Sequence, residues 1–424
     1  MVEQTLKITH QQRIGFLADC TREEFERRIR RLREEMERHR VDGLLLTQEK
    51  NVRYATAYYE VGWIVPAYFY MVFIPRDEKL PLAIFCPEGD QIQTEASWIE
   101  TVIRWDYPTG FYTGPVGGAL VEALAEWINK LGLNQGVIAT EMGAHFRLGL
   151  SIEVFDDVRK SLPEVRWNDC EEIIWAVRMI KSNEELRRIR EAARISCLAV
   201  RTGFEAIVEG ISERELANVI AAKMYTEGAS EISFLSLYAG PERVLWADSV
   251  PRRDITMRPG SLLQFDGGCS YEGYVCDFKR FACLGEPTAD QRRFFELAKE
   301  SEQAAIDIVA PGVSYGALYE SSQQVLRDAG YGDFVDWCQK MSWSSIGHNV
   351  GLDVHEMPGV SIDNETVLEP NMVLAIEPFF WHEGKYPLWE VSNKYGCEDL
   401  VLVTESGYEI LTPESIISRD IWVA

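Results

Sequence analysis

The spacing of apolar and polar residues predicts helices that alternate with buried strands in the first third of the chain. The first helix opens with a capping-box signature, Thr21 followed by Glu24. Its apolar residues recur at helical intervals, at Phe25, Ile29, Leu32 and Met36. Strand-like runs follow at 44–46, 69–75, 82–86 and 137–141, with a helix at about 118–132. This alternation predicts a small α/β domain over about residues 20–165.

The pattern changes near residues 171–183, and we place a domain boundary between 170 and 180. The predicted domains therefore span residues 1–175 and 176–424. Capping signatures then predict four helices, beginning after Ser182, Ser212, Thr288 and Ser314 and ending near 208, Gly228, Pro311 and Gly330. Strand-like segments lie at 232–284, before the second pair of helices, and at 343–424, after it. This order predicts an α+β fold for the second domain.

Composition narrows the class of protein. A chain of 424 residues is too long for one ordinary core, and its formal charge of −24 repels phosphate backbones, which argues against nucleic-acid partners. The nine cysteines are scattered without a CxxC pair, and the N-terminal stretch lacks an apolar signal core, so we expect a cytoplasmic protein. The longest apolar run, residues 61–75, contains Pro66 and is too short to span a membrane.

Four acidic residues interrupt or border apolar strand segments of the second domain: Asp266, Asp277, Glu377 and Glu398. An unpaired buried carboxylate costs several kcal/mol, so a bound cation is the simplest compensation, although some of these acids could simply end strands and cap turns. An oxygen-rich set with one imidazole suits Mn²⁺, Fe²⁺, Co²⁺ or Zn²⁺. Four negative charges balance two divalent ions, and two ions can hold a bridging hydroxide as a nucleophile.

Two of the six histidines, His348 and His355, lie seven positions apart in SIGHNVGLDVHEMP, residues 345–358. This stretch is too rich in glycine for a stable helix. The two imidazoles could be a pair of metal ligands, one ligand and one catalytic group, or two unrelated surface residues.

Together these motifs resemble the pita-bread metallopeptidases of family M24, the creatinase, prolidase, aminopeptidase P and methionine aminopeptidase group. The resemblance covers nearly the whole chain. FERRIRRLREEMERHRVDGLLLTQEKNVRYATAY is similar to the opening helix and strand of the creatinase-type N-terminal domain. FDGGCSYEGYVCDFKRF, GHNVGLDVHEMP, AIEPFF and GCEDLVLV are similar, in order and spacing, to the family's metal-binding motifs.

The resemblance implies a role for each matched residue. Asp266 would chelate one metal ion, Asp277 and Glu398 would bridge both ions, and His348 and Glu377 would hold the second. His355 would be a catalytic donor that hydrogen-bonds the substrate and the tetrahedral intermediate, and a donor beside a developing oxyanion needs no metal. The alternative interpretation of His355 is an ordinary loop histidine without a catalytic role. Glu377 would also act as a catalytic proton shuttle.

Two positions depart from the family pattern. Peptide-cleaving members carry a histidine about eighteen residues before the first aspartate, where this chain reads LWADSVP at 245–251. Members also carry an arginine two residues before the last glutamate, where Gly396 stands here with Lys394 nearby. Trp246 and Asp248 are therefore the candidate substrate-binding residues. A cationic substrate would fit Asp248 and the aromatic residues of 61–75 through charge and cation–π contacts, although core packing also explains those aromatics.

Three functions remain open from the sequence. The first is a metal-dependent hydrolase resembling Xaa-Pro dipeptidase or aminopeptidase P, which attacks an amide (C–N) bond of a short peptide. The second is an enzyme for a non-peptide small molecule, either a creatinase-like C–N hydrolase or a lyase that cleaves dimethylsulfoniopropionate. The third is a metal-free binding protein. The resemblance also implies a homodimer.

Overall fold

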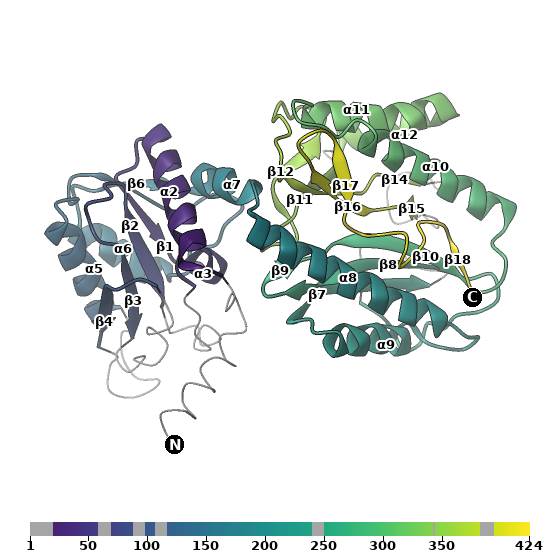
Figure 1. The fold of residues 1–424 in the computed structure, drawn as a ribbon, viewed down its shortest axis with the longest axis horizontal. Helices are drawn as coiled ribbons and strands as arrows, with labels where there is room; N and C mark the ends of the chain where they lie inside the picture. Colours follow the sequence, from purple (N-terminus) through teal and green to yellow (C-terminus); the bar gives the residue numbers. More distant parts are fainter. Residues whose placement is uncertain are drawn as a thin grey trace, which may run out of the picture. The chain divides into compact units, whose positions relative to one another are not determined.

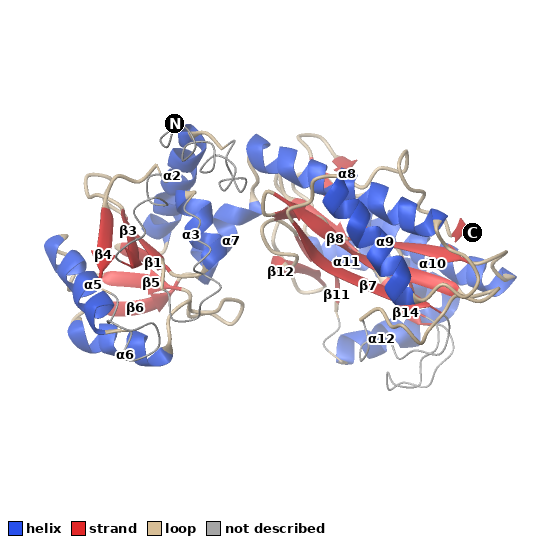
Figure 2. Cartoon of the chain, turned by 90° about the horizontal axis from the view of Figure 1, so that it is seen from below, coloured by secondary structure: helices blue, strands red, loops and turns tan. Residues whose placement is uncertain are grey.

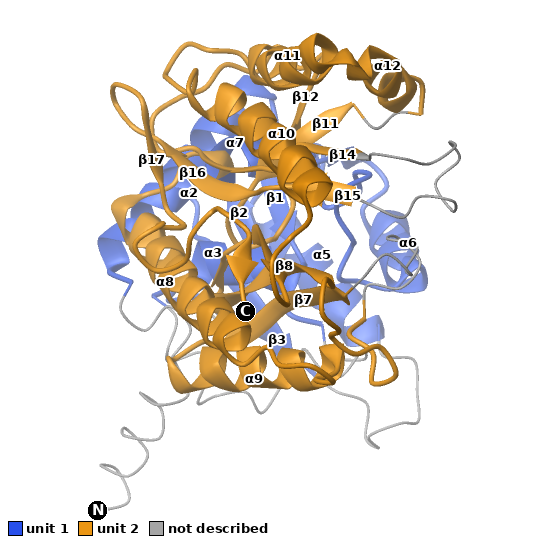
Figure 3. Cartoon of the chain, turned by 90° about the vertical axis from the view of Figure 1, so that its right-hand side faces the viewer, with its two compact units in different colours: residues 1–178 blue, residues 179–424 orange. Residues whose placement is uncertain are grey.

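The computed structural model describes residues 20–57, 69–87, 98–106, 117–239, 250–341, 344–381 and 394–424. The chain forms two compact units, residues 1–178 and 179–424 (Figures 1 and 3). Trp246, Asp248 and much of the aromatic run at 61–75 lie outside the described residues.

Unit 1 is built on a six-stranded mixed sheet with the order β4-β3-β2-β1-β5-β6. Its strands are β1 (Gly43–Leu46), β2 (Met71–Pro75), β3 (Ala83–Pro87), β4 (Val102–Trp105), β5 (Val137–Thr140) and β6 (Arg166–Asp169). β1 runs antiparallel to β2 and parallel to β5, so the centre of the sheet joins segments almost a hundred residues apart. The four predicted apolar runs all lie in this sheet.

Helices cover both faces of this sheet (Figure 2). They are α2 (Arg22–Arg38), α3 (Glu49–Thr56), α5 (Gly118–Lys130), α6 (Ile152–Ser161) and α7 (Glu171–Met179). Thr21 caps α2 through its hydroxyl, as predicted, whereas Glu24 pairs with Arg27 and Arg28. Side chains alternate along a strand, so Leu45 joins the apolar core under α5 and α6 while its two neighbours face the other side. The sequence did not predict α3.

A buried glutamate fastens the start of α3 to the sheet. The carboxylate of Glu141, directly after β5, accepts hydrogen bonds from the Thr47 backbone N–H (2.7 Å) and hydroxyl (2.6 Å), the Gln48 N–H (3.1 Å) and Asn51 Nδ2 (2.9 Å). An acceptor at a helix N-terminus satisfies donors that have no partner within the helix. Burial nevertheless raises the pKa of Glu141, because these hydrogen bonds only partly offset the loss of water.

Unit 2 contains two larger sheets and a two-stranded sheet. The first has the order β18-β10-β8-β7, with β9 paired to β8, and the second has the order β12-β11-β13-β16-β17. The first comprises β7 (Glu231–Ala239), β8 (Leu262–Tyr271), β9 (Tyr274–Val275), β10 (Phe278–Cys283) and β18 (Trp422–Val423). The others are β11 (Ser345–Asn349), β12 (Glu356–Ser361), β13 (Val373–Ile376), β16 (Asp399–Val403), β17 (Tyr408–Ile410) and the pair β14 (Phe379–Trp381) and β15 (Lys394–Gly396).

Helices flank these sheets on their outer sides (Figure 1). They are α8 (Asn183–Glu205), α9 (Glu213–Thr226), α10 (Ala289–Ile306), α11 (Tyr315–Leu326) and α12 (Gly332–Lys340). The capping boxes predicted for α8, α9 and α10 are confirmed, with both reciprocal bonds present in each. The helical course that begins with α11 breaks at Gly330, as predicted, because this glycine adopts a left-handed, non-helical conformation (φ +88°). A further helix that the sequence did not predict, α12, begins at Gly332. The α/β and α+β architectures are those predicted. Among the described helices, none has the length and apolar character required to cross a bilayer.

The anchoring role of Glu141 leads to a stability prediction. Replacement by alanine leaves buried donors without acceptors, so we expect Glu141→Ala to lower the free energy of unfolding by about 2–4 kcal/mol. Glu153→Ala, at an exposed position in the first turn of α6, should change it by less than about 1 kcal/mol. Urea titrations followed by circular dichroism measure both values. Equal stabilities of the two variants would contradict this role.

Candidate metal centre

The five predicted ligands come from strands, or from their ends, in both larger sheets of unit 2. Asp266 lies in β8 and Asp277 immediately precedes β10, while His348 lies in β11, Glu377 follows β13 and Glu398 precedes β16. An isolated bridge joins the two sheets here, with the Lys279 N–H donating to the Glu398 carbonyl at 3.2 Å. The residues are therefore brought together where one sheet meets the other.

Possible ligand atoms converge at this junction. One atom from each residue lies within 4.8 Å of the others in three groups: His348, Glu377 and Glu398; Asp266, Asp277 and Glu398; and Asp277, His348 and His355. Asp277 is 2% exposed and Glu398 is fully buried, whereas Asp266 and Glu377 are partly exposed. The cluster thus has a buried side and a side that solvent can reach.

Three buried polar atoms of this cluster make no hydrogen bond: Oδ1 of Asp277, Oε1 of Glu398 and Nε2 of His348. Nδ1 of His348 lies 3.1 Å from the Asn349 carbonyl. A carbonyl only accepts, so Nδ1 carries a proton and donates it, and Nε2 is the ring nitrogen directed toward the carboxylates of Asp277 and Glu377. Buried polar atoms rarely remain without partners, and a fixed second nitrogen is typical of metal-bound histidines. These residues therefore fit a divalent cation.

Burial and neighbouring charges shift the pKa values of the acidic residues in this cluster in opposite directions. Burial, reinforced by the neighbouring carboxylates, raises the pKa of Asp277 and that of Glu398 well above their usual values. Burial acts in the same direction on Glu377, but the positive charge of Lys279 and the imidazole of His348 hold its pKa well below the usual value. For Asp277 and Glu398 the positive charge of the protein does not offset burial, although Lys279 lies 3.0 Å from Glu398.

His355 lies beside His348 and has more contact with solvent. The two ring centroids are 4.0 Å apart with an angle of 47° between the planes, and His355 is exposed. Partial burial of the ring, together with the neighbouring His348, lowers its pKa. A neutral imidazole at the exposed rim can reach a substrate. It could also approach the ion held by Asp277 and His348, so the geometry permits either role.

Lys279 also belongs to this site, although it was not among the residues predicted from the sequence. Its ammonium group lies 3.2 Å from Asp266 Oδ2, 3.1 Å from Glu377 Oε2 and 3.0 Å from Glu398 Oε2, and its side chain is 1% exposed. Burial alone would lower the pKa of Lys279, but the three carboxylates outweigh it and raise the pKa well above its usual value. A signal existed in the sequence, because residues two apart on a strand share a face and Lys279 follows Asp277 by two.

The pKa of a second lysine, Lys394 in β15, depends on the same charged residues of the cluster. Burial and the positive charge of Lys279 lower the pKa of Lys394 to about 8, while Asp266, Glu377 and Glu398 act in the opposite direction. Its ammonium lies 4.8 Å from the centroid of the Phe379 ring. Lys394 is therefore a cation near the cluster, two residues before Gly396, where the sequence lacks the arginine of the family pattern.

Behind the cluster, a buried ion-pair network holds β10 against β16. Arg280 donates to the carbonyls of Lys279 (2.9 Å) and Glu398 (2.8 Å) and pairs with Asp399, which is fully buried. Asp399 also pairs with Arg419 at 2.7 Å. Arg280 thereby fixes the backbone of two residues whose side chains enter the cluster.

Glu302, Cys397 and Asp399 form another group with metal-like spacing. Arg419 pairs with Glu302 at 2.7 Å, and Arg280 and Arg419 both pair with Asp399. Two guanidinium groups therefore balance the two carboxylates, and no cation is needed. This group is a structural network.

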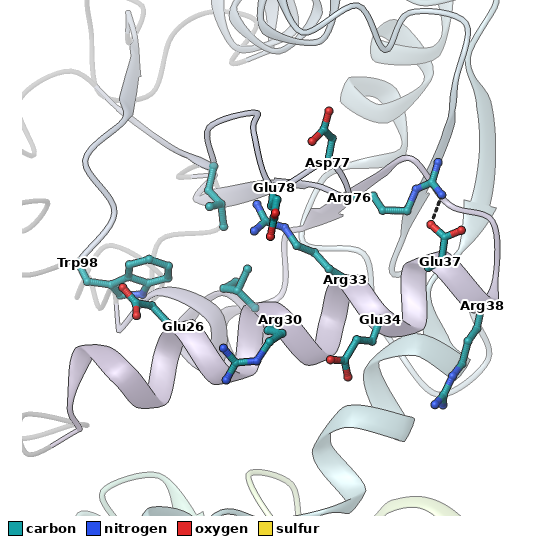
Figure 4. A pocket seen from close by; sticks show the side chains of 12 residues that line it. Glu26, Arg30, Arg33, Glu34, Glu37, Arg38, Arg76, Asp77, Glu78 and Trp98 are labelled. Atoms are coloured by element: carbon teal, nitrogen blue, oxygen red, sulfur yellow. Dashed lines mark hydrogen bonds and ion pairs between the residues drawn. The ribbon is translucent and has the colours of Figure 1, made fainter.

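An open pocket on unit 1 also has many charged side chains, which come from α2 and from the loop between β2 and β3 (Figure 4). Its charges are partly neutralised within the protein, because Arg76 pairs with Glu37 and with Asp42. None of the metal-like groups found among the described residues includes a residue that lines this pocket. Among the described residues, the groups with metal-like spacing therefore all lie in unit 2.

Comparisons with known proteins match the two parts of the chain to two different sequence profiles. The sequence profile of metallopeptidase family M24 matches residues 187–405, and that of the creatinase/prolidase N-terminal domain matches residues 28–180. The chain is 26% identical to an uncharacterized peptidase of Staphylococcus aureus over 390 residues, which cover 91% of this chain and 98% of the relative.

Two further relatives have more specific names. An Xaa-Pro dipeptidase of Lactobacillus delbrueckii subsp. lactis is 28% identical over 269 residues, 63% of this chain and 69% of that protein. The solved prolidase of Pyrococcus furiosus superimposes with a TM-score of 0.71 at 25% identity, covering 90% of this chain and 99% of that one. The pita-bread fold expected from the resemblance is confirmed.

The network behind the cluster leads to a second stability prediction. Arg280→Met leaves Asp399 short of one partner and removes one donor from the Lys279 and Glu398 carbonyls, so we expect a loss of about 3–5 kcal/mol in the free energy of unfolding. The matched control is Arg292→Met, which removes an ion pair with Glu286 at the surface and should cost less than about 1 kcal/mol. Chemical denaturation of each variant measures the difference. An Arg280→Met protein as stable as the control would show that the network is dispensable.

Proposed function

The chain belongs to metallopeptidase family M24, and from that premise we propose that it is a metal-dependent hydrolase of the Xaa-Pro dipeptidase or aminopeptidase P type. It would cleave an amide (C–N) bond in a short peptide. The observation that carries this proposal is the set of buried ligand atoms without hydrogen bonds on Asp277, His348 and Glu398. The catalytic domain would be the region 176–424.

The metal ligands in this proposal are Asp266, Asp277, His348, Glu377 and Glu398. Their oxygen-rich composition favours Mn²⁺, with Fe²⁺, Co²⁺ and Zn²⁺ as the other candidates. Such an ion would supply Lewis-acid polarisation of the scissile carbonyl group and lower the pKa of a bound water. Both effects are needed to hydrolyse an unactivated amide near neutral pH.

The chain's own residues complete the chemistry. Glu377 is partly exposed and holds its low pKa beside Lys279, so it is ionised and can accept a proton from water before passing it to the leaving amine. His355, at the exposed rim, would donate a hydrogen bond to the oxyanion that develops on the carbonyl oxygen. Lys394 offers a positive charge for a peptide carboxylate where the family's arginine is missing. Trp246 and Asp248 remain candidates for substrate contact.

The compartment and assembly are part of the same proposal. All nine cysteines are free thiols and eight of them are buried, which fits a reducing cytoplasm. A homodimer is proposed by analogy with other members of the family, and sedimentation velocity would test it.

The proposed division between His348 and His355 can be tested by substitution. His348→Ala removes a ligand, and we expect metal affinity to fall by on the order of 100-fold or more, since even the loss of a ligand's supporting hydrogen bond costs 10- to 100-fold. His355→Ala should keep the metal and lower kcat by about 10²–10³, the effect of losing one oxyanion donor. Metal titration calorimetry and steady-state kinetics measure the two quantities. His39→Ala, far along the sequence in α2's C-terminal turn, is the control. Equal metal loss in the His348 and His355 variants would make His355 a ligand.

The substrate class is tested with a panel of Xaa-Pro dipeptides and Xaa-Pro-Xaa tripeptides in the presence of Mn²⁺. We expect turnover of at least one series, abolished by a chelator and restored by the ion. The arrangement at Lys394 favours substrates with a free carboxylate near the scissile bond, so amidation of that carboxylate should raise KM. Turnover of small cationic amides or sulfonium compounds, without turnover of any peptide, would reject the peptidase proposal in favour of a non-peptide substrate.

A further inference from the structure

Lys279 lies among the carboxylates that are candidates to hold metal ions. Lys279 in β10 is directly paired with Asp266 in β8, so both side chains project from the same face of the sheet. The ammonium group contacts Asp266, Glu377 and Glu398 at 3.0–3.2 Å. Three carboxylates around one buried cation form the environment that a metal ion would otherwise occupy.

The oxygens contacted by Lys279 differ from those that lack partners. Lys279 contacts Oε2 of Glu398, whereas Oε1 of the same carboxylate makes no hydrogen bond. It likewise contacts Oε2 of Glu377, whose Oε1 lies 3.4 Å from His348 Nε2. Each of these glutamates therefore turns one oxygen toward the ammonium; the other oxygen of Glu377 lies beside His348, and the other oxygen of Glu398 is buried without a hydrogen bond.

We propose that the Lys279 ammonium takes the place of one of two metal ions, so that the centre binds a single divalent ion through Asp277, His348, Glu377 and Glu398. Asp266, the expected chelator of the other ion, is instead a partner of Lys279. This inference depends on the proposed function only for the assumption that a divalent ion binds.

The charge of the site agrees with one ion. Asp266, Asp277, Glu377 and Glu398 carry four negative charges when ionised. Lys279, the nearby Lys394 and one divalent ion carry four positive charges. A second divalent ion would leave an excess of two positive charges around a buried ammonium. It would also compete with that ammonium for the same oxygens.

The test counts ions in the full-length protein. Chelator-treated protein is reloaded with Mn²⁺, dialysed and analysed for metal per chain, and the electron paramagnetic resonance spectrum reports whether bound Mn²⁺ ions are magnetically coupled. We expect one uncoupled ion in the wild type. Lys279→Met removes the charge at similar volume and should bind two ions, with coupling between them. Lys279→Arg keeps the charge and should bind one.

Lys181→Met is the matched control for loss of a buried lysine in the same unit, because Lys181 is 2% exposed and pairs with Glu356. It should bind one ion. Circular dichroism and thermal melting verify that each variant is folded, and the count for the wild type tests the inference even where a variant fails to fold. Two ions in the wild type, no ion in the wild type, or a single ion in folded Lys279→Met would each overturn the inference.

The inference and the proposed function can fail separately. Two ions with peptide hydrolysis would overturn the single-ion centre and leave the peptidase proposal intact. One ion without hydrolysis of any peptide would support the single-ion centre and reject the peptidase proposal.

Discussion

The central physical constraint in this structure is the repulsion among carboxylates that share a buried site. Asp277 and Glu398 are buried, and Asp266 and Glu377 lie beside them, so each added negative charge opposes the others where water provides little screening. A protein can hold such a group only by supplying positive charge. In the second unit that charge comes from a lysine within the cluster and from paired arginines behind it, and the atoms that remain without partners fit a divalent cation.

Two neighbouring residues of β10 meet two neighbouring residues at the start of β16. Side chains alternate along a strand, so Lys279 and Arg280 project to opposite faces, as do Glu398 and Asp399. Lys279 contacts Glu398 on one face, and Arg280 contacts Asp399 on the other. The register between β10 and the start of β16 therefore determines which side chains enter the carboxylate cluster and which enter the network of ion pairs behind it. A shift of one residue would place the guanidinium group among the metal ligands and the ammonium in the supporting network.

Much of the fold could be predicted because its signals are local. Capping boxes, apolar spacing and turn residues located the long helices and the central strands. Helix α12 was missed because it begins without a capping side chain: Tyr331 at its N-cap provides no side-chain capping hydrogen bond, and Gly330, at φ +88°, separates this helix from the preceding one. Helix α3 was missed because its N-terminus is stabilised from a distance by Glu141, more than ninety residues further along the chain. Non-local partners of this kind leave no pattern in a short window of sequence.

The ligand set could be proposed from the sequence because carboxylates in apolar strands are conspicuous, whereas Lys279 was overlooked as one of many lysines. Its pairing with Asp266 depends on the register between β8 and β10, which the sequence alone does not specify. The distinction matters for chemistry, since a lysine provides one fixed charge with three donors, whereas a divalent ion accepts lone pairs and polarises the groups it binds. If Lys279 replaces one ion, as we propose, Lewis-acid chemistry would be confined to the side of His348 and Asp277. Lys279 within the cluster and Lys394 near it both add positive charge, and together they make the site more positive than its carboxylates alone suggest.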